Sequence, residues 1–329
     1  MILAGDIGGT KVNLALFKEE AGRLQPTEEA RFESRDYSGL ESILDEYLKR
    51  PHAEIHKACF GVAGPVRDGK SRITNLSWDV DAQSLRKQLG QCEVFLINDL
   101  AAMACAAPFL DASELLTLQT GQSEREGRIT VLAAGTGLGE AFLLPGENGR
   151  YRILDSEGGH CDFASRNKVE TELLDFLLRQ FDRVSVERIL SGAGLLQIYR
   201  FFREVYALEE NDAVSQALQG NDPVRVIVRC GMEKKSQACE RTLGLFVSIY
   251  GAVAGNLALQ FLSDGGVYVG GGIAPSLAPL MVEGGFMEAF LSKGRFRPYL
   301  ERVPVKVILN DRASLLGAAH YAMGKKFIH

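Results

Sequence analysis

The sequence is short of cysteine, of basic clusters and of an N-terminal targeting pattern, and each shortage excludes a class of protein. Six cysteines in 329 residues, widely spaced and without a C-x-x-C pair, exclude a disulfide scaffold and favour reduced thiols in the cytoplasm. The pair His160-Cys161 has no second ligand pair beside it and is weak as a metal site. The net charge is −5 and no basic run occurs, so we expect no nucleic-acid partner. Met1 to Gly9 lacks a basic segment and a cleavage site, so we expect no secretion by a standard signal.

The chain has one long uncharged hydrophobic run, from Thr242 to Leu262. It is long enough to span a bilayer and contains Gly251-x-x-x-Gly255, a spacing known from membrane helix dimers. Polar residues such as Asn256 and Gln260 dilute it, and no cationic cluster flanks it. The better interpretation is a central helix packed on all sides of a large domain. We therefore expect no membrane partner.

Ordinary composition and alternating elements predict an α/β protein. Apolar residues make up 46% of the chain and charged residues 24%, and the length suits two domains. Strands are expected at 2–17 (two strands that turn at Gly8-Gly9, with a further turn at 19–22), 58–63, 94–97, 129–134, 266–269 and 305–309. Helices are expected at 40–48, 101–107, 171–181, 186–199 (interrupted at Ser191–Gly194) and 313–323, with a further one after Pro275. Strands that alternate with helices indicate the α/β class.

The stretch Gly64 to Ser71, GPVRDGKS, matches the phosphate-binding P-loop pattern G-x-x-x-x-G-K-[ST]. A working P-loop needs a helix directly after the loop, and the residues that follow have no helical period. Pro65 also removes an amide donor. Asp68-Gly69 instead indicates a hairpin turn, with Val66 and Ile73 on the flanking strands.

Three other glycine-rich turns follow predicted strands and are better candidates for phosphate binding. Glycine lets the backbone approach a ligand closely, and its N–H groups can point at phosphate oxygens. The first turn contains an acidic residue, Asp6. A carboxylate beside phosphates is reasonable only with a cation between them, and Mg²⁺ with its water shell is the expected cation. The residues concerned are Gly5, Asp6, Ile7, Gly8, Gly9 and Thr10; Gly135, Thr136 and Gly137; and Gly270, Gly271 and Gly272.

The ordered set of motifs resembles the bacterial glucokinase family, within the hexokinase group of the actin-like ATPase superfamily. The matching stretches run in order from residue 3 to about residue 321 and include LAGDIGGTKVNLALF, ITNLSWDV, FLINDLAAMA, AAGTGLG, SEGGHCDFA, SVERILSGAGL and VYVGGGIAP. The zinc-binding cysteine cluster of the repressor-related sugar kinases is absent.

This resemblance implies a two-lobed actin-like/ribonuclease H-like ATPase fold with a central cleft between the lobes. Residues 1–108 and about 306–329 would form a smaller α/β lobe, and 109–305 a larger one with sugar and adenosine contacts. The implied reaction is ATP-dependent phosphorylation of D-glucose to glucose 6-phosphate, with Mg²⁺, by a cytoplasmic homodimer. Binding of glucose would close the cleft and exclude water.

The resemblance also assigns roles to five polar residues. Asp99, at the end of an apolar strand and the start of a helix, would be the base on the sugar 6-hydroxyl. Asn98 would bind on the 4- and 6-hydroxyl side, and Glu157, His160 and Glu187 toward the anomeric side. From spacing alone, Asn98-Asp99 could equally be a helix cap.

Two other functions remain as alternatives. The first is an ATP-binding regulator or chaperone-like module of the same fold, which would usually carry a further domain. The second is a dinucleotide oxidoreductase that uses Gly135 to Gly139. Its spacing is G-x-G-x-G instead of G-x-G-x-x-G, and no suitable ribose-binding acid follows.

Overall fold

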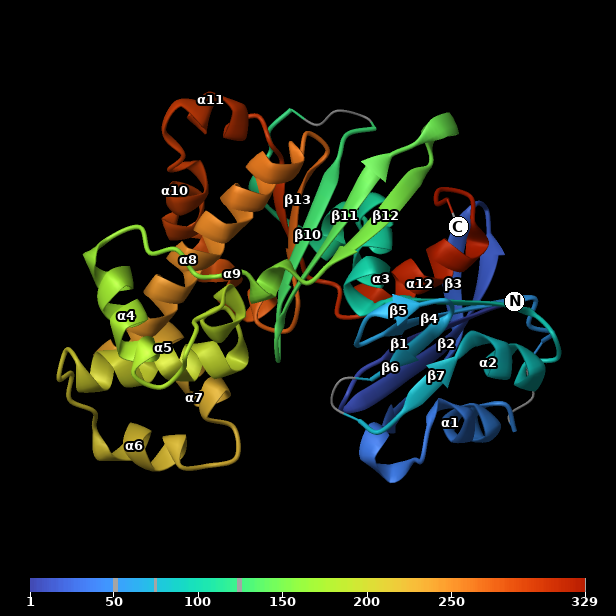
Figure 1. Cartoon of the computed structure of the whole chain (residues 1–329), viewed down its shortest axis with the longest axis horizontal. Coiled ribbons are helices and arrows are strands. Elements are labelled where there is room, and N and C mark those ends of the chain that lie inside the picture. Colours follow the sequence, from blue (N-terminus) through green and yellow to red (C-terminus); the bar gives the residue numbers. More distant parts are fainter. Residues whose placement is uncertain (50–52, 74–75, 123–125, 329) are drawn as a thin grey trace. The chain divides into compact units, whose positions relative to one another are not determined.

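The structure, a computed structural model, describes residues 1–49, 53–73, 76–122 and 126–328. It divides into two compact units, which we describe separately (Figure 1). Unit 1 comprises Met1–Asp111, Ala141–Asp155 and Asn310–His329, and unit 2 comprises Ala112–Glu140 and Ser156–Leu309. The sequence analysis did not foresee that Ala141–Asp155 groups with unit 1. Residues 74 and 75 of the stretch ITNLSWDV lie outside the described residues.

Unit 1 is built on a sheet of strand order β3-β2-β1-β4-β8. The strands are β1 (Ile2–Ile7), β2 (Lys11–Glu20), β3 (Arg23–Glu33), β4 (Lys57–Val62) and β8 (Glu93–Asn98). The hairpin of β1 and β2 is confirmed, but β2 runs to Glu20, so the turn expected at 19–22 is confined to Ala21 and Gly22, both at positive φ. Strand β3 was not foreseen, because it is a mostly exposed edge strand that carries charges and Pro26.

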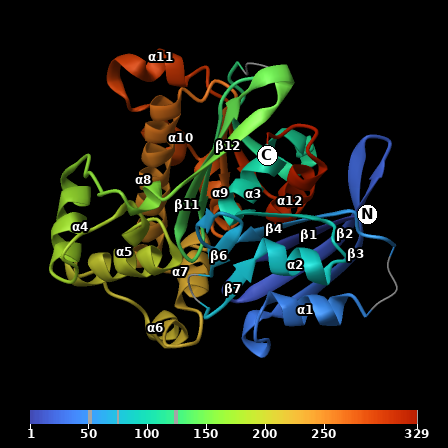
Figure 2. The same cartoon turned by 45° about the vertical axis from the view of Figure 1, so that its right-hand side comes forward.

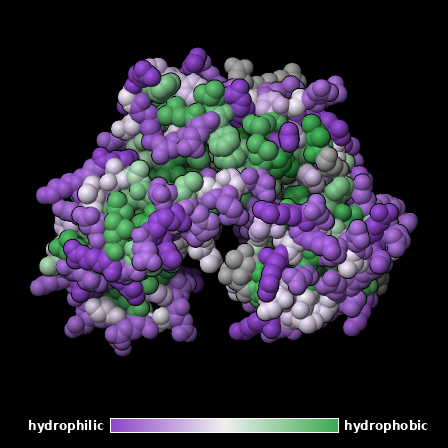
Figure 3. All heavy atoms as spheres, viewed as in Figure 1, coloured by the Kyte–Doolittle hydropathy of each residue, from purple (hydrophilic) through white to green (hydrophobic). Residues whose placement is uncertain are grey.

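Helices cover both faces of this sheet (Figure 2). On one face, α1 (Leu40–Tyr47) and α2 (Ala82–Gln88) enclose an apolar core with the strands. Hydrophilic side chains cover much of the surface around them (Figure 3). On the other face, α3 (Asp99–Ala106) and α12 (Ala313–Met323) pack against each other and the sheet.

Two glycines bring α3 close to its neighbours. A Cβ built on Gly317 of α12 would lie 1.8 Å from the Ala102 carbonyl oxygen, and a Cβ on Gly61 of β4 would lie 2.9 Å from the Ala102 Cβ. Since neither position has room for a side chain, α3 is held tightly between β4 and α12. The helix that begins at Asp99 is therefore well fixed.

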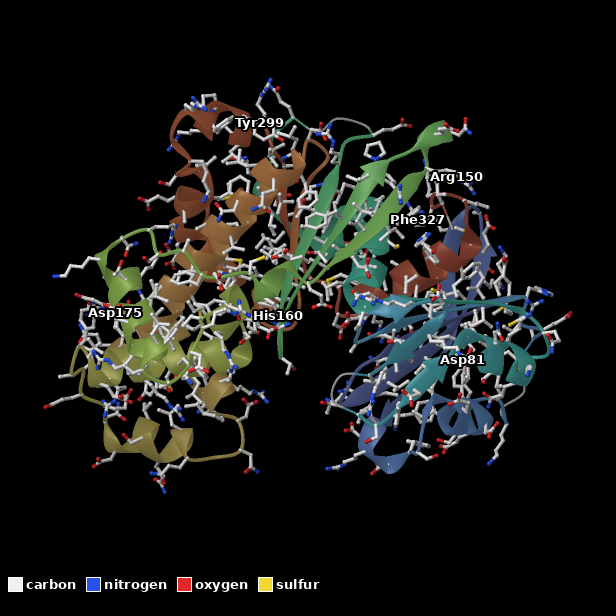
Figure 4. The ribbon with its side chains drawn as sticks, in the orientation of Figure 1. Asp81, Arg150, His160, Asp175, Tyr299 and Phe327 are labelled. Atoms are coloured by element: carbon white, nitrogen blue, oxygen red, sulfur yellow. The ribbon has the colours of Figure 1, made fainter. Side chains whose placement is uncertain are left out.

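The stretch that matches the P-loop pattern forms a β-hairpin. Its strands β5 (Val66–Arg67) and β6 (Lys70–Arg72) pair antiparallel, and β7 (Asp79–Asp81) extends the small sheet. Asp68 and Gly69 have φ of 50° and 69°, as a type I′ turn requires. The hairpin prediction is confirmed, although Ile73 lies one residue beyond β6. Lys70 Nζ pairs with Asp81 Oδ2 at 3.2 Å, where β7 meets α2 (Figure 4).

Unit 2 contains most of the second sheet, of order β12-β11-β10-β13-β14-β9, and a set of helices. The strands are β9 (Leu115–Gln119), β10 (Ile129–Ala134), β11 (Leu138–Pro145), β12 (Tyr151–Ser156), β13 (Gly266–Gly270) and β14 (Val305–Ile308). The helices are α4 (Lys168–Leu178), α5 (Gly192–Glu204), α6 (Asp212–Leu218), α7 (Pro223–Met232), α8 (Gln237–Phe261), α9 (Ala274–Val282), α10 (Gly285–Leu291) and α11 (Arg297–Leu300).

Side-chain caps account for the starts of two of the expected helices. The helix expected at 171–181 begins at Lys168, because Asn167 Oδ1 accepts the Glu170 N–H at 3.0 Å. The interruption expected at Ser191–Gly194 is confirmed, because a short 3₁₀ turn at Val186–Arg188 is separate from α5, which begins at Gly192 with Ser191 as its cap.

Helix α8 is the hydrophobic segment noted in the sequence. Among the described residues it is the one helix long and apolar enough to cross a membrane by length and composition, yet 67% of its most apolar window is buried. A Cβ on Gly251 would lie 2.0 Å from the Phe286 carbonyl oxygen, and a Cβ on Gly255 would lie 2.5 Å from that of Phe290. The two glycines of the G-x-x-x-G spacing thus allow α10 to pack closely against α8 (Figure 1). The expected packing on all sides is wrong, since Gly244, Asn256 and Gln260 are exposed.

Candidate active site

The first glycine turn and Asp99 emerge at the same edge of the unit 1 sheet. Strands β1, β4 and β8 run parallel, with Ile7 opposite Val62 and Val62 opposite Asn98. Neighbouring strands are separated by nearly 5 Å, so the ends of β1 and β8 lie about 10 Å apart. The carboxyl ends of parallel strands are a common place for ligands in α/β proteins.

Some main-chain groups of the turn at Gly8 are hydrogen-bonded within the protein. The Gly8 N–H donates to the Lys11 carbonyl at 2.9 Å, so this N–H is used within the turn. Ser34, which is 1% exposed, donates its hydroxyl to the Gly8 carbonyl at 2.9 Å, and its N–H donates to the Thr10 carbonyl. Ser34 was missed because nothing near it in the sequence links it to a turn about 25 residues earlier.

Asp6 lies beside this turn. Its carboxylate accepts a hydrogen bond of 3.3 Å from Asn13 Nδ2, the residue opposite it on β2. Burial raises the pKa of Asp6, because a low-dielectric surrounding disfavours the charged form, and the Asn13 hydrogen bond only partly opposes this. A nearby cation would favour the ionised form. Among the described residues, no group of three or more His, Cys, Asp or Glu side chains is placed to hold a metal directly.

Asn98 and Asp99 have different places at the start of α3. Asn98 Oδ1 accepts the N–H groups of Leu100 at 2.9 Å and Ala101 at 3.3 Å, and its Nδ2 donates to the Gly64 carbonyl at 3.3 Å. The capping interpretation therefore holds for Asn98. Asp99 is the first residue of the helix, where the partial positive charge of the N-terminus favours a carboxylate, and its Oδ1 lies 2.9 Å from the Leu100 N–H.

In unit 2, the second and third glycine turns lie together. Strands β10 and β13 are parallel neighbours with Ala133 opposite Gly270, so Gly135 and Gly271 follow adjacent strand ends. Gly271 has a φ of +85°, and a Cβ there would lie 2.3 Å from the Ala134 carbonyl oxygen. Position 271 therefore requires glycine for both its conformation and its close approach.

A buried tyrosine that the sequence did not reveal holds the bases of these two turns. The Tyr250 hydroxyl, from α8, accepts the Ala134 N–H at 3.0 Å. It lies 3.2 Å from the carbonyl oxygens of both Leu132 and Gly270. Burial raises the pKa of Tyr250 far above its usual range, so the group stays a neutral donor.

Glu157, His160 and Glu187 gather in unit 2, and His160 is labelled in Figure 4. His160 Nε2 lies 3.7 Å from Glu157 Oε2, and His160 Nδ1 lies 3.8 Å from Glu187 Oε1. Glu187 Oε2 also accepts the Leu138 N–H at 3.0 Å, next to Gly137 of the second glycine turn. Two carboxylates and an imidazole, all partly exposed, can together bind several hydroxyl groups of a polar ligand.

Two short backbone contacts bring His160 to Glu187. The Phe163 N–H donates to the Val184 carbonyl, and the Val186 N–H to the Cys161 carbonyl, both at 2.9 Å. Arg183 Nη1 adds bonds to the His160 carbonyl at 2.7 Å and to Asp162 Oδ1 at 2.8 Å. The sequence analysis missed Arg183. Its one signal was its place four residues before Glu187.

The structure thus brings the predicted residues together within each unit. Unit 1 holds the first glycine turn with Asn98 and Asp99, and unit 2 holds the other two turns with Glu157, His160 and Glu187.

Comparisons with known proteins agree over nearly the whole chain. The family model described as Glucokinase matches residues 3–325. A glucokinase of Nostoc punctiforme is 40% identical, covering 97% of this chain and 98% of its own length. A solved glucokinase from an Antarctic psychrotroph has a TM-score of 0.86 at 31% identity, over 98% of this chain and 99% of its own. A ROK family glucokinase from Streptomyces griseus, solved in complex with glucose and AMPPNP, has a TM-score of 0.67 at 20% identity, over 98% of this chain and 99% of its own, which shows a shared fold.

Proposed function

Because this chain belongs to the glucokinase family, we propose that Asp99 is the base of its reaction, the phosphorylation of glucose by ATP. The observation that carries the proposal is the place of Asp99. It is the first residue of a helix held by Gly61 and Gly317, at the same sheet edge as a glycine turn. The helix N-terminus stabilises the negative charge of a carboxylate there, and the helix fixes its position.

In this proposal Asp99 aligns the sugar 6-hydroxyl and accepts its proton while the phosphoryl group moves. Transfer through a loose transition state depends on positioning and on electrostatic stabilisation more than on covalent chemistry by the protein. Asn98 fixes the start of the helix, because its Oδ1 accepts two main-chain N–H groups, and we assign its amide to the 4- and 6-hydroxyl side of the sugar.

We assign the anomeric side of the sugar to unit 2. His160 lies within 4 Å of both Glu157 and Glu187. A buried sugar hydroxyl needs a polar partner, and this cluster supplies acceptors and one imidazole donor. Glu187 accepts the Leu138 N–H, so the cluster lies beside the second glycine turn, which we propose as a phosphate contact.

We propose the glycine turns of each unit as contacts for nucleotide phosphates. The candidates are Gly5, Asp6, Ile7, Gly8, Gly9 and Thr10 in unit 1, and Gly135, Thr136, Gly137, Gly270, Gly271 and Gly272 in unit 2. Magnesium, when bound, would neutralise phosphate charge. Mg²⁺ usually keeps several of its waters and binds through one or two carboxylates, so we propose that Asp6, the acidic residue of the first glycine turn, holds it through water. A cytoplasmic homodimer is the assembly and location that we propose with this function.

The Asp99→Asn variant tests the base. We expect glucose affinity within a small factor of wild type and kcat lower by about 10² or more, because the amide keeps the shape but accepts no proton. Glucose affinity is measured by calorimetry, and turnover by a coupled assay. Asp111→Asn, an exposed aspartate of the same unit, is the matched control and should keep full activity. Near wild-type turnover by Asp99→Asn would rule Asp99 out as the base.

A further inference from the structure

Glu140 is a buried carboxyl group without a part in the proposed reaction. It lies in β11, directly after the glycine turn at 135–139, and is 4% exposed. Burial raises the pKa of Glu140 to about 7, and a hydrogen bond with the Ser156 hydroxyl partly opposes that rise. Glutamate is seldom buried to this degree unless it holds a specific partner.

The partner of Glu140 is the loop that begins at Ser156. The Gly158 N–H donates to Ser156 Oγ at 2.9 Å, and Ser156 is in turn hydrogen-bonded to the Glu140 carboxyl group. A Cβ built on Gly158 would lie 2.0 Å from Glu140 Oε2. The Glu140 carboxyl group therefore lies directly against the main chain of the loop. Glycine at position 158 permits this contact, because a Cβ there would overlap with the carboxyl group.

That loop carries two of the proposed sugar-binding groups. Glu157 lies between Ser156 and Gly158, and His160 ends the same 3₁₀ turn. The turn has a second contact with β11, because a Cβ on Gly159 would lie 2.3 Å from the Leu138 carbonyl oxygen.

Leu138 and Glu140 are two residues apart on β11, so their side chains share one face of the strand. Leu138 also donates its N–H to Glu187. One short piece of strand thus holds the whole Glu157–His160–Glu187 cluster.

We propose that Glu140 is a positioning residue for glucose binding, which fixes the loop of Glu157 and His160 through Ser156 and Gly158 without contact with the sugar. This inference depends on the proposed function, since it requires that Glu157 and His160 bind the sugar. The hydrogen bond from Ser156 is the essential element, so an uncharged acceptor of the same shape should serve nearly as well.

The test compares Glu140→Ala with Glu140→Gln in the purified full-length enzyme. Without the acceptor, the Ala variant should bind glucose about tenfold more weakly, which corresponds to one lost buried hydrogen bond. Its KM for glucose should rise in parallel, while kcat and the KM for ATP stay within about threefold, because uniform binding is lost and not transition-state stabilisation. The Gln variant should return glucose binding to within about threefold of wild type. Glucose binding is measured by calorimetry without nucleotide.

Ser156→Ala is a second, milder variant, which removes one hydroxyl and should weaken glucose binding in the same direction. Glu170→Ala is the matched control, because Glu170 is fully buried in the same unit but pairs with Arg166. It should lower stability without a specific change in glucose affinity. The proposal fails if folded Glu140→Ala and Ser156→Ala bind glucose as wild type does, or if Glu140→Ala weakens glucose and AMPPNP binding equally.

Variants of the loop itself separate this proposal from the proposed function. If Glu157→Gln and His160→Ala bind glucose normally, the assigned sugar site is wrong. If they lose glucose binding and Glu140→Ala does not, the sugar site stands and only the positioning role of Glu140 is wrong.

Discussion

Lys70 shows how a residue takes its role from the local fold and not from a matching pattern. In the P-loop pattern this lysine would reach nucleotide phosphates. Here it lies on an exposed hairpin and pairs with Asp81, whose Oδ1 caps α2 by accepting the Gln83 N–H at 2.8 Å. Its charge therefore serves a surface contact.

Lys70→Ala should leave the KM for ATP within about twofold of wild type, because a surface ion pair contributes only about 0–1 kcal/mol and no phosphate contact is lost. Coupled assays over a range of ATP concentrations give this value. A large rise in the KM for ATP would restore the P-loop interpretation.

The polar residues that could be predicted from the sequence are those carried by motifs. Asn98, Asp99, Glu157, His160 and Glu187 were all proposed in this way. Ser34, Glu140 and Tyr250 were not, because each acts through a contact with a distant or buried partner that has no local pattern. Burial decides their roles, and a single sequence does not show burial.

At the scale of elements, α8 shows how one spacing serves two physical settings. Gly251-x-x-x-Gly255 permits close approach of a helix in a membrane or in a protein core. In this structure the partner is α10. Gly244 of the same helix has no atom within 4 Å of the place where its Cβ would lie.

A pair of glycine variants in α8 separates these positions. Gly251→Ala should destabilise the protein by about 1–3 kcal/mol, because the new Cβ has to displace the main chain at Phe286. Gly244→Ala should instead stabilise by up to about 1 kcal/mol, since alanine favours the helix and meets nothing. Urea unfolding of both variants measures these free energies. Equal effects in both would contradict the assigned packing of α8 on α10.

Elements with a strong period or an apolar run were predicted well. The strand at 129–134 and the helix at 313–323 have the bounds observed for β10 and α12. Strand β3 and the starts of α3 and α4 were missed or misplaced, because edge pairing and side-chain caps determine them. The hairpin at Asp68-Gly69 was predictable because its turn chemistry is local.

At the scale of the whole molecule, His320 makes stability depend on pH. Its ring stacks on Phe109 with centroids 3.6 Å apart, and its Nδ1 is buried without a hydrogen-bond partner in the described part of the chain. Burial lowers the pKa of His320 from 6.5 to about 4. Between these two values the unfolded chain binds more protons than the folded one, so the free energy of unfolding falls as the pH falls.

His320→Phe should remove this dependence while it keeps an aromatic ring on Phe109. Between pH 7.5 and pH 4, the free energy of unfolding should fall by on the order of 3 kcal/mol more in the wild type than in the variant. Glu140 acts in the opposite direction, because its raised pKa gives stability that is lost as the pH rises toward 7, but it is common to both proteins. Urea unfolding at several pH values gives the comparison. Parallel losses in the two proteins would mean that another group controls the acid limit.

The Tyr250 hydroxyl has a thermodynamic consequence for nucleotide binding. One phenol joins the ends of two neighbouring strands immediately before their glycine turns. The conformational entropy of the backbone in these turns is thus lost when the chain folds, and not when a phosphate binds. Phosphate binding to turns that are already rigid loses less conformational entropy. Removal of the hydroxyl oxygen by Tyr250→Phe would leave the turns to be ordered when the nucleotide binds.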